Sequence, residues 1–477
     1  MLNQSATAWC SVLSKALPNR VFRENSTAYN LSVSSYWARQ ETELRPACVV
    51  AACATHEVAK AIHTLTILNR NESCPFAIRA GGHGKSGASS SQGGVVIDLS
   101  AMSAVTVNHG RGTVTVGVGA KWAEVYAALD PLNITVPGAR SADVGVGGLT
   151  LAGGIGYLFP RIGLTVNNII DVEMVLASGK VVHTSSPQHE DIGIAVRGGT
   201  NNFGVATAIE IASSNLTGTW GGTSIYSIDT APQQLQAIHD FTADSDFDEY
   251  ATALLSFGYS GGQAAAINNI VYTSSVSSAP QKLRRFVEIP ALYSTLRPAS
   301  MSDIAHETAA ASPHGFRQAT FTLTLINDLE VTSEAFALWN SSWPPLAAVP
   351  GLSLSFSLEP FPRIALDKTG NDVLNLRAGS EPLLVYLLSA TWLNEENDDV
   401  VYSTAHDLLR RTEHVAVARN KLHPFKYIGY AHHTQNPLAG YGADNVGFMR
   451  RVSHKYDPEQ LFQRAVGGGF KLSEAGV

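Results

Sequence analysis

The chain has 477 residues, of which 45% are hydrophobic and 15% are charged. This length and composition are typical of a globular protein with two or three domains, each with a sizeable core. The formal net charge of -7, without any basic block, argues against a nucleic-acid partner, and no run of about eighteen apolar residues predicts a membrane span. We therefore expect neither a nucleic acid nor a membrane among its partners.

Cysteine usage favours an oxidising compartment. An even number of cysteines bunched near the N-terminus predicts one or two disulfides and leaves the pairing open. They favour a secreted or secretory-pathway protein whose signal was removed over a cytoplasmic one, although residues 1–20 lack the basic start and apolar core of such a signal. The cysteines are Cys10, Cys48, Cys53 and Cys74, and Asn-X-Ser/Thr sites for N-glycosylation occur at Asn3, Asn25, Asn30, Asn71, Asn133, Asn215 and Asn340.

In the first 212 residues, helical and strand-like hydrophobic patterns alternate. Apolar residues that recur every three or four positions predict helices, and strict alternation predicts half-buried strands. The predicted helices are 7–17, 56–68 and 121–129, and the predicted strands are 47–52, 76–78, 95–99, 104–107, 113–117, 169–176, 180–183 and 208–212.

Three glycine-dense segments, 79–87, 144–156 and 197–207, lie between these elements, and we expect each to be bracketed by strands. The first reads Arg-Ala-Gly-Gly-His-Gly-Lys-Ser-Gly. Because glycine has no Cβ, such loops let backbone amides approach the oxygens of a ligand closely. This concentration of glycine loops is unusual for a structural domain.

Two familiar nucleotide motifs do not fit these loops. The Gly-Lys-Ser sequence at 84–86 ends like a nucleoside-triphosphate loop, but Arg79 stands where that motif needs its first glycine, and no helical run follows. A dinucleotide-binding βαβ unit fails at 145–156, because no G-x-G-x-x-G phasing opens a helix there and Glu173 lies inside the next strand.

From residue 217 onward the alternating runs become longer. Strands interleaved with helices in this manner favour an α+β domain with one antiparallel sheet backed by helices. We expect 314–324 and 383–391 to line a substrate pocket. The predicted strands are 223–228, 253–259, 267–272, 316–325, 353–358 and 383–391, with helices at 232–240 and 333–339.

A hydrolase is the alternative from another class. Residues 258–262 match the G-x-S-x-G nucleophile elbow after a strand, which would make Ser260 the nucleophile and His423 or His432 the base. The following strand at 267–272 favours a hairpin tip instead. The adjacent His432 and His433 would point apart in a strand, so we expect a solvated pair and no metal.

Later segments complete a family pattern. Tyr427-Ile-Gly-Tyr430, Gln435-Asn-Pro-Leu438 and the segment 456–471 follow the three glycine loops in an order and spacing that resemble the berberine-bridge-enzyme-like flavin oxidases, particularly their fungal branch. The resemblance covers nearly the full chain. It implies the α+β vanillyl-alcohol-oxidase (PCMH-type) fold: a two-subdomain FAD-binding domain at 40–214, closed by 421–477, a substrate domain at 215–420 and an N-terminal arm at 1–39.

The resemblance also implies the cofactor contacts. His83 would be joined covalently to the methyl group at position 8 of the flavin ring, and Gly81, Gly82, Lys85 and Ser86 would cradle the FAD pyrophosphate. Tyr430, or else Tyr427, would be the catalytic base, and Tyr430 would also contact the cofactor. The other implied FAD-binding residues are Arg79, Ala80, Gly84, Ser141, Val144, Gly147, Gly148, Gly153, Gly154, Gly156, Gly204 and Val205.

This chain departs from the family pattern at several positions. Ser141 stands where many relatives attach the flavin a second time through cysteine, so we predict a single covalent bond. Leu149 replaces a frequent histidine, and Gly429 and His432 replace the asparagine and aspartate of the tyrosine block. Val144 matches a small residue that lets oxygen reach the flavin, which favours O2 as electron acceptor.

The implied activity is a two-electron oxidation of a small organic substrate such as a secondary metabolite, alcohol or sugar. Hydride would pass to flavin N5, and O2 would be reduced to H2O2. An alternative within the same fold is a cyclase of secondary metabolism with little net oxidation. Because a tyrosine with a pKa near 10 is a poor base, the oxidase mechanism requires a nearby cation or the flavin to lower that pKa.

Overall fold

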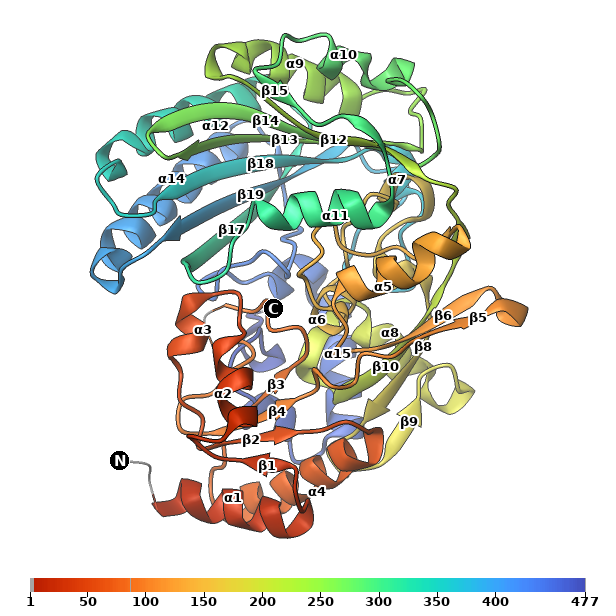
Figure 1. The fold of residues 1–477 in the computed structure, drawn as a ribbon, viewed down its shortest axis with the longest axis vertical. Helices are drawn as coiled ribbons and strands as arrows, with labels where there is room; N and C mark the ends of the chain where they lie inside the picture. Colours follow the sequence, from red (N-terminus) through yellow and green to blue (C-terminus); the bar gives the residue numbers. More distant parts are fainter. Residues whose placement is uncertain (1–3, 86, 477) are drawn as a thin grey trace.

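The computed structural model describes residues 4–85 and 87–476. Sheets of four, five and nine strands, with a two-stranded ribbon of β7 (Ile134–Thr135) and β11 (Ser214–Asn215), organise these residues. The two smaller sheets occupy the lower half of Figure 1 and the nine-stranded sheet the upper half. The mixture of helices and mainly antiparallel sheets confirms the predicted α+β class.

The four-stranded sheet carries the first glycine loop. Its order is β1 (Val21–Phe22), β2 (Cys48–Ala51), β4 (Val95–Asp98), β3 (Phe76–Arg79), and β4 runs parallel to both β2 and β3. Parallel neighbours need a crossover connection, which α4 (Thr55–Asn71) supplies between β2 and β3. The loop therefore starts at the carboxyl end of β3, an edge of the sheet where ligands commonly bind.

A disulfide joins α1 (Gln4–Ala16) to this sheet. It links Cys10 to Cys48, and α1 packs against α4. Cys53 is an exposed free thiol and Cys74 a buried one. The cysteine count predicts one or two disulfides, and one is present among the described residues.

The five-stranded antiparallel sheet has the order β5 (Val105–Asn108), β6 (Thr113–Gly117), β10 (Val205–Ala212), β8 (Ile169–Val175), β9 (Val181–His183). The prediction that strands bracket every glycine loop is wrong for the second and third loops. The second contains a short helix, α6 (Val146–Leu151), and the third follows α8 (Glu190–Gly199). In α6, Val146 and Thr150 are buried one helical turn apart, a pattern too short to stand out among the glycines.

The nine-stranded antiparallel sheet forms the upper half. Its strands are β12 (Thr219–Ser227), β13 (Ala251–Ser260), β14 (Gln263–Tyr272), β15 (Tyr293–Ser294), β16 (Arg297–Ala299), β17 (Arg317–Ile326), β18 (Ser353–Phe361), β19 (Leu383–Trp392) and β20 (Leu422–His423).

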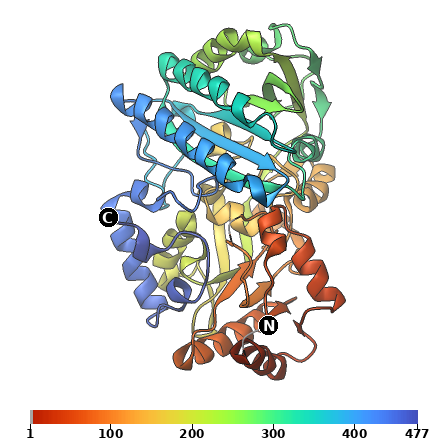
Figure 2. The same ribbon diagram turned by 90° about the vertical axis from the view of Figure 1, so that its left-hand side faces the viewer.

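Helices cover this sheet. The helices α9 (Ala231–Thr242), α12 (Leu329–Ser342) and α14 (Asp398–Ala418) pack together on one face, as Figures 1 and 2 show. Another helix, α11 (Met301–Ala310), contacts both β12 and α5 (Trp122–Leu129) and so lies between the two halves of the molecule. An antiparallel sheet backed by helices was the prediction for this region, and it is confirmed.

Smaller helices complete the chain. The last part of the chain returns to the lower half, where α15 (Gly442–Tyr456) contacts α8 and Phe76 of β3 forms an isolated bridge with Val466. These helices are α2 (Thr27–Ser34), α3 (Arg39–Glu43), α7 (Phe159–Ile162), α10 (Arg284–Val287), α13 (Arg363–Leu366), α15 (Gly442–Tyr456) and α16 (Leu461–Arg464).

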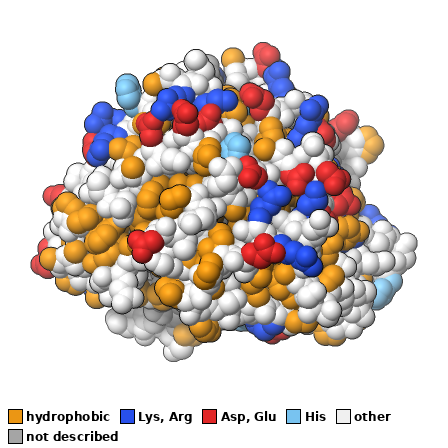
Figure 3. All heavy atoms as spheres, turned by 90° about the horizontal axis from the view of Figure 1, so that it is seen from above, with side chains coloured by type: hydrophobic (Ala, Val, Ile, Leu, Met, Phe, Trp, Pro, Cys, Tyr) orange, Lys and Arg blue, Asp and Glu red, His pale blue; other side chains and the backbone are white. Residues whose placement is uncertain are grey.

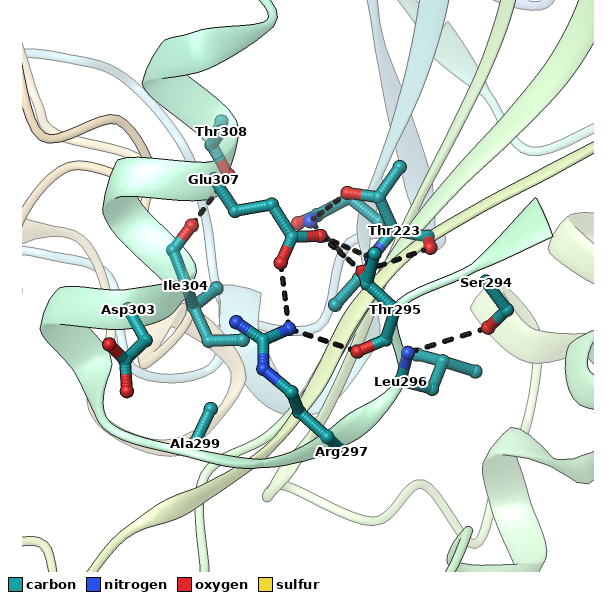
Figure 4. A network of polar contacts seen from close by, with 12 residues as sticks. Thr223, Ser294, Thr295, Leu296, Arg297, Ala299, Asp303, Ile304, Glu307 and Thr308 are labelled. Atoms are coloured by element: carbon teal, nitrogen blue, oxygen red, sulfur yellow. Dashed lines mark hydrogen bonds and ion pairs between the residues drawn. The ribbon is translucent and has the colours of Figure 1, made fainter.

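A polar network anchors α11 to the edge of the nine-stranded sheet (Figure 4). Glu307 accepts hydrogen bonds from the Thr223 backbone amide (2.9 Å) and the Thr295 hydroxyl, and its second oxygen lies 2.8 Å from Nη1 of Arg297. Partial burial raises the pKa of the Glu307 carboxyl, but the hydrogen bonds from Thr295 and Arg297 hold it below its ordinary value. The network fixes α11, and with it Thr308, beside the site described below.

Ser260 lies at a hairpin tip. It ends β13 and pairs with Gln263, the first residue of β14, across Gly261 and Gly262, whose φ angles are +59° and +87°. A nucleophile elbow leads from a strand into a helix, whereas this turn joins two antiparallel strands. The hydrolase alternative is therefore wrong.

Across residues 4–85 and 87–476, no helix combines the length and apolar character needed to cross a bilayer. The upper face carries acidic and basic side chains intermixed with hydrophobic ones (Figure 3).

Candidate active site

The glycine segments meet at the first loop. A Cβ on Gly81 would lie 2.3 Å from the Cα of Gly145, so the backbones of the first and second loops touch. A Cβ on Gly468 would lie 2.3 Å from the carbonyl oxygen of Gly87, which brings the C-terminal segment against the same loop. Asn202, in the third segment, donates a hydrogen bond to the Phe470 carbonyl at 3.0 Å. Four segments distant in sequence thus form one backbone-lined region.

His83 lies in this region with its ring against Trp37. The two rings are 4.1 Å apart at an interplanar angle of 10°. Burial, together with the positive charge of Lys85, lowers the pKa of His83 to about 3. The imidazole is therefore neutral near pH 7 and keeps a nitrogen lone pair for bonding.

Half-buried Lys85 and buried Lys471 supply positive charge to the region. Burial lowers the pKa values of both Lys85 and Lys471 to about 8. Lys85 donates to the Gly429 carbonyl at 3.5 Å, and Lys471 to the amide oxygen of Asn201 at 3.5 Å, so both hydrogen bonds are long and end on neutral oxygens. Ammonium groups held in this way are available to an anion such as a pyrophosphate.

Two hydroxyl groups in or near the second loop make no hydrogen bond to any described residue. Among the described residues, the buried hydroxyls of Ser141 and Thr150 have no hydrogen-bond partner. A Cβ on Gly148 would meet nothing within 4 Å, so space lies beside that backbone. Neutral donors and acceptors, open space and two cations together fit FAD, with its ribityl hydroxyls and pyrophosphate.

Other residues predicted to bind the cofactor instead make contacts within the protein. The Arg79 side chain turns away to a buried ion pair with Asp98 (2.9 Å), so only its backbone remains for a cofactor. A Cβ on Gly156 would clash with the Gly138 carbonyl and one on Gly204 with the Val175 carbonyl.

The remaining predicted residues differ in their neighbours. Val205 is buried in β10, and the Val144 carbonyl accepts a 3.0 Å hydrogen bond from the Trp122 amide. A Cβ on Gly147 would lie 3.4 Å from the Cβ of Ala80, and one on Gly84 would lie 2.8 Å from Oγ of Ser89. A Cβ on Gly82 would lie 3.1 Å from the guanidinium of Arg79. Ser86 lies outside the described residues.

A second cluster surrounds Tyr430. Arg140 donates from Nη2 to Oε1 of Glu359 (2.6 Å) and to the Tyr430 hydroxyl (2.5 Å), and that hydroxyl donates to the same Oε1 at 3.0 Å. Glu359 is only 2% exposed, and its Oε2 has no hydrogen-bond partner in the part of the chain that is described. One carboxylate oxygen is thus committed to the cluster and the other is free.

The pKa values of Tyr427 and Tyr430 are both raised, so both hydroxyls keep their protons near pH 7. Burial raises the pKa of Tyr430 well above its ordinary value, although Arg140 acts in the opposite direction. Burial also raises the pKa of Tyr427 to about 12, and its hydroxyl accepts a hydrogen bond from the Gly154 amide at 3.2 Å. The Tyr427 ring stands perpendicular to that of Tyr430, and Gly153 packs on it with a φ of +126°. Both hydroxyls are therefore donors near pH 7.

The predicted pocket strand β17 holds the tyrosine block in place. Thr320 donates to the Tyr430 carbonyl at 2.6 Å, and Gln435 makes a pair of amide hydrogen bonds with the Thr322 backbone, at 2.8 and 3.0 Å. On the side of α11, the Tyr157 hydroxyl donates to Asn269 at 2.7 Å and lies 3.1 Å from the hydroxyl of Thr308.

The prediction that His432 and His433 are both solvated is correct only for His433. His433 is exposed, but His432 is 2% exposed and stacks on Phe321 with ring centroids 4.3 Å apart. The two residues lie in an irregular turn, so the strand geometry assumed for them does not apply. No group of three or more His, Cys, Asp or Glu residues placed to hold a metal occurs in the described ranges.

Sequence reasoning missed Arg140, Glu359, Trp37 and Lys471. A glutamate within the apolar strand 353–361 was a usable signal, because a charged residue on a buried strand needs a partner. Arg140 gave no such signal, since its partner lies 219 residues away.

Comparison with known proteins gives one family model and several fungal relatives. A family model described as "FAD binding domain" matches residues 46–185. FAD-dependent monooxygenase sdcF of Emericella nidulans is 35% identical over 98% of both chains. FAD-dependent monooxygenase FUP4 of Fusarium proliferatum is 34% identical over 92% of this chain and 87% of its own.

Solved structures share the fold at low identity. Physcomitrella patens BBE-like 1 superposes with a TM-score of 0.79 at 17% identity, covering 97% of this chain and 99% of its own. Xylooligosaccharide oxidase from Myceliophthora thermophila gives 0.78 at 18% identity, covering 97% and 100%. The 6-hydroxy-D-nicotine oxidase from Arthrobacter nicotinovorans gives 0.77 at 18%, covering 93% and 96%.

Fold, site and relatives together define an FAD-dependent oxidoreductase. More particularly, the chain belongs to the family of the fungal proteins named FAD-dependent monooxygenases, and it has the fold of Physcomitrella patens BBE-like 1.

Proposed function

We propose that this enzyme is an oxidase that removes two electrons from a small neutral organic substrate and passes them to O2, with FAD tethered by one covalent bond to His83. The observation that carries the proposal is the Arg140–Glu359–Tyr430 cluster, with a free carboxylate oxygen on Glu359. When bound, FAD supplies the two-electron acceptor, and O2 regenerates it with release of H2O2.

Glu359 is the proton acceptor in this proposal. Its unpartnered Oε2 takes a hydrogen bond, and then the proton, from a substrate O–H or N–H group as hydride leaves the neighbouring carbon. In this proposal Tyr430 is a hydrogen-bond donor and not the base that the sequence predicted, because its pKa is raised well above its ordinary value. Arg140 holds both groups in place through bonds of 2.6 and 2.5 Å.

The charge of the cluster favours a neutral substrate. Arg140 and Glu359 compensate each other in a setting where an additional unpaired charge is costly. A hydroxylated secondary metabolite, an alcohol or a sugar meets this requirement. The names of the structural neighbours point to a sugar oligomer in one case and to a nicotine derivative in another, so the fold is compatible with different substrates.

The single tether has two supports. His83 is neutral, since its pKa is about 3, and lies among the glycine loops. Ser141 offers an unpartnered hydroxyl where a second attachment would need a thiolate.

Relatives named FAD-dependent monooxygenases provide a second candidate, in which one oxygen atom enters the product. The test is to incubate the purified enzyme with panels of hydroxylated metabolites, alcohols and sugars under ¹⁸O₂. An oxidase releases one H2O2 per product and leaves the product free of ¹⁸O. Incorporated ¹⁸O identifies a monooxygenase, and an isomerised product without oxygen uptake identifies a cyclase.

On this proposal the enzyme is also secreted and glycosylated. The Cys10–Cys48 disulfide and the exposure of Asn25, Asn30, Asn133 and Asn340 are the support. Treatment of the native protein with an N-glycosidase should lower its mass; an unchanged mass contradicts glycosylation.

A further inference from the structure

Trp37 covers one face of the His83 imidazole. The rings lie 4.1 Å apart and are tilted by only 10°, and the Trp37 backbone amide donates to the Gly82 carbonyl at 3.0 Å. The same residue therefore contacts both the side chain that carries the proposed tether and the backbone immediately before it. A rotation of the imidazole out of its plane would lose the stack.

Trp37 is itself held by the substrate-domain loop at 312–316. It is 6% exposed, its indole Nε1 donates to the Ser312 carbonyl at 3.2 Å, and its carbonyl accepts from the Gly315 amide at 3.4 Å. Arg39, two residues later, donates from its backbone to Phe316 at 2.8 Å. These bonds fix the plane of the indole independently of His83.

The preceding residue ties the segment to the first loop a second time. The Tyr36 hydroxyl donates to the Ser89 carbonyl at 2.8 Å, and its ring lies 4.4 Å from the Arg79 guanidinium. Arg79 is in turn paired with Asp98. The segment around residue 37 is therefore a rigid backing for the loop that carries His83.

We propose that Trp37 is a positioning residue for covalent flavin attachment: it holds the neutral imidazole in the one orientation that bonds the flavin. This inference rests on the proposed His83 tether.

In the attachment, a bond forms between an imidazole nitrogen and the carbon of the 8-methyl group. The imidazole N–H proton and one methyl proton move to ring nitrogens of the flavin, which becomes reduced by two electrons and is reoxidised by O2. The imidazole nitrogen has to meet the methyl carbon in line for this bond to form, so orientation is the contribution that the proposal gives to Trp37.

The test compares the fraction of flavin-loaded molecules that carry FAD covalently, measured by intact mass spectrometry and by flavin retained after acid precipitation. Trp37→Leu fills space without a stacking face, and Trp37→Met is made in parallel in case one variant is unstable. Each is expected to bind FAD that acid releases, with a covalent fraction reduced about tenfold from wild type. Trp37→Phe restores a stacking face and should recover most of the covalent fraction.

A matched control is available in the substrate domain. Trp343 stacks on Tyr259 with centroids 4.2 Å apart and an interplanar angle of 11°, away from the glycine loops. Trp343→Ala should keep the wild-type covalent fraction. A wild-type fraction in Trp37→Leu or Trp37→Met, or an equal loss in Trp343→Ala, overturns the inference. Wild-type protein without covalent FAD overturns the proposed tether instead.

Discussion

Arg140 and Glu359 form an ion pair whose side chains are 12% and 3% exposed. Removing one partner of such a pair leaves the other charge buried and uncompensated, which is costly. A neutral substitution of either residue therefore also disturbs its partner, and FAD binding has to be measured beside catalysis. A size-matched substitution keeps the packing of the site.

Glu359→Gln keeps the size of the side chain and removes its capacity to accept a proton. We expect kcat to fall by about 10²–10⁴ with FAD still bound, because a positioned general base contributes about this much. Tyr430→Phe removes a hydroxyl that donates to Glu359 and accepts from Arg140, but it leaves the proposed base in place and should have a smaller effect. Steady-state peroxide release on a responsive substrate is the measurement.

The matched control is Glu210→Gln, a buried glutamate of β10 that accepts a hydrogen bond from Thr113. It should leave kcat near wild type. A larger loss in Tyr430→Phe than in Glu359→Gln would restore the tyrosine as base and contradict our assignment.

Lys85 gives the cofactor site a pH dependence. Its pKa in the free protein is lowered to about 8 by burial, so its charge is present below that pH and is lost as pH rises through it. FAD affinity, measured by titration in a His83→Ala background to remove the tether, should therefore fall as pH rises through about 8. Lys85→Met should bind FAD more weakly at pH 7, by about 1.5–3 kcal/mol, with a flatter pH profile.

The pKa of Lys471 is also lowered to about 8, so this lysine contributes to the decrease in FAD affinity as pH rises. Lys60→Met, at an exposed lysine of α4, is the control and should change neither affinity nor slope. An unchanged slope in Lys85→Met would show that this lysine does not contact the phosphates.

Among the elements, α1 is attached both by the Cys10–Cys48 bond and by its packing against α4. The bond closes a loop with a sequence separation of 38, and loss of such a cross-link typically costs about 2–4 kcal/mol. The double variant Cys10→Ser/Cys48→Ser should lower the free energy of unfolding by roughly this amount in denaturant titrations. Cys53→Ser, at an exposed free thiol, should have no effect; a loss there equal to the double variant would point to a different pairing.

Long strands were the most predictable elements. The runs 253–259, 353–358 and 383–391 lie inside β13, β18 and β19; burial alternates strictly along β13 and over part of β18 and β19. The helix α14 was missed although its signal was present: Val401, Ala405, Leu408 and Thr412 are buried at helical spacing. The short α6 was not predictable, because its few residues are mostly glycine and buried apolar groups.

At the scale of the whole molecule, the order of the glycine loops and the C-terminal segments predicted the family over nearly the full chain. Their convergence could be expected from that resemblance alone, since local patterns do not specify which loops meet. The two unpredicted parts of the site arise from contacts between halves of the molecule. Arg140 meets Glu359 across 219 residues, and Trp37 is fixed by a carbonyl 275 residues away.

The central claim is that His83 is the sole covalent anchor of FAD in this enzyme. Intact mass spectrometry of the denatured wild-type protein and of His83→Ala tests it directly. We expect the wild type to carry the mass of one FAD and His83→Ala to carry none, with flavin released by acid. A wild-type mass without FAD, or a His83→Ala protein that retains it, would contradict the account.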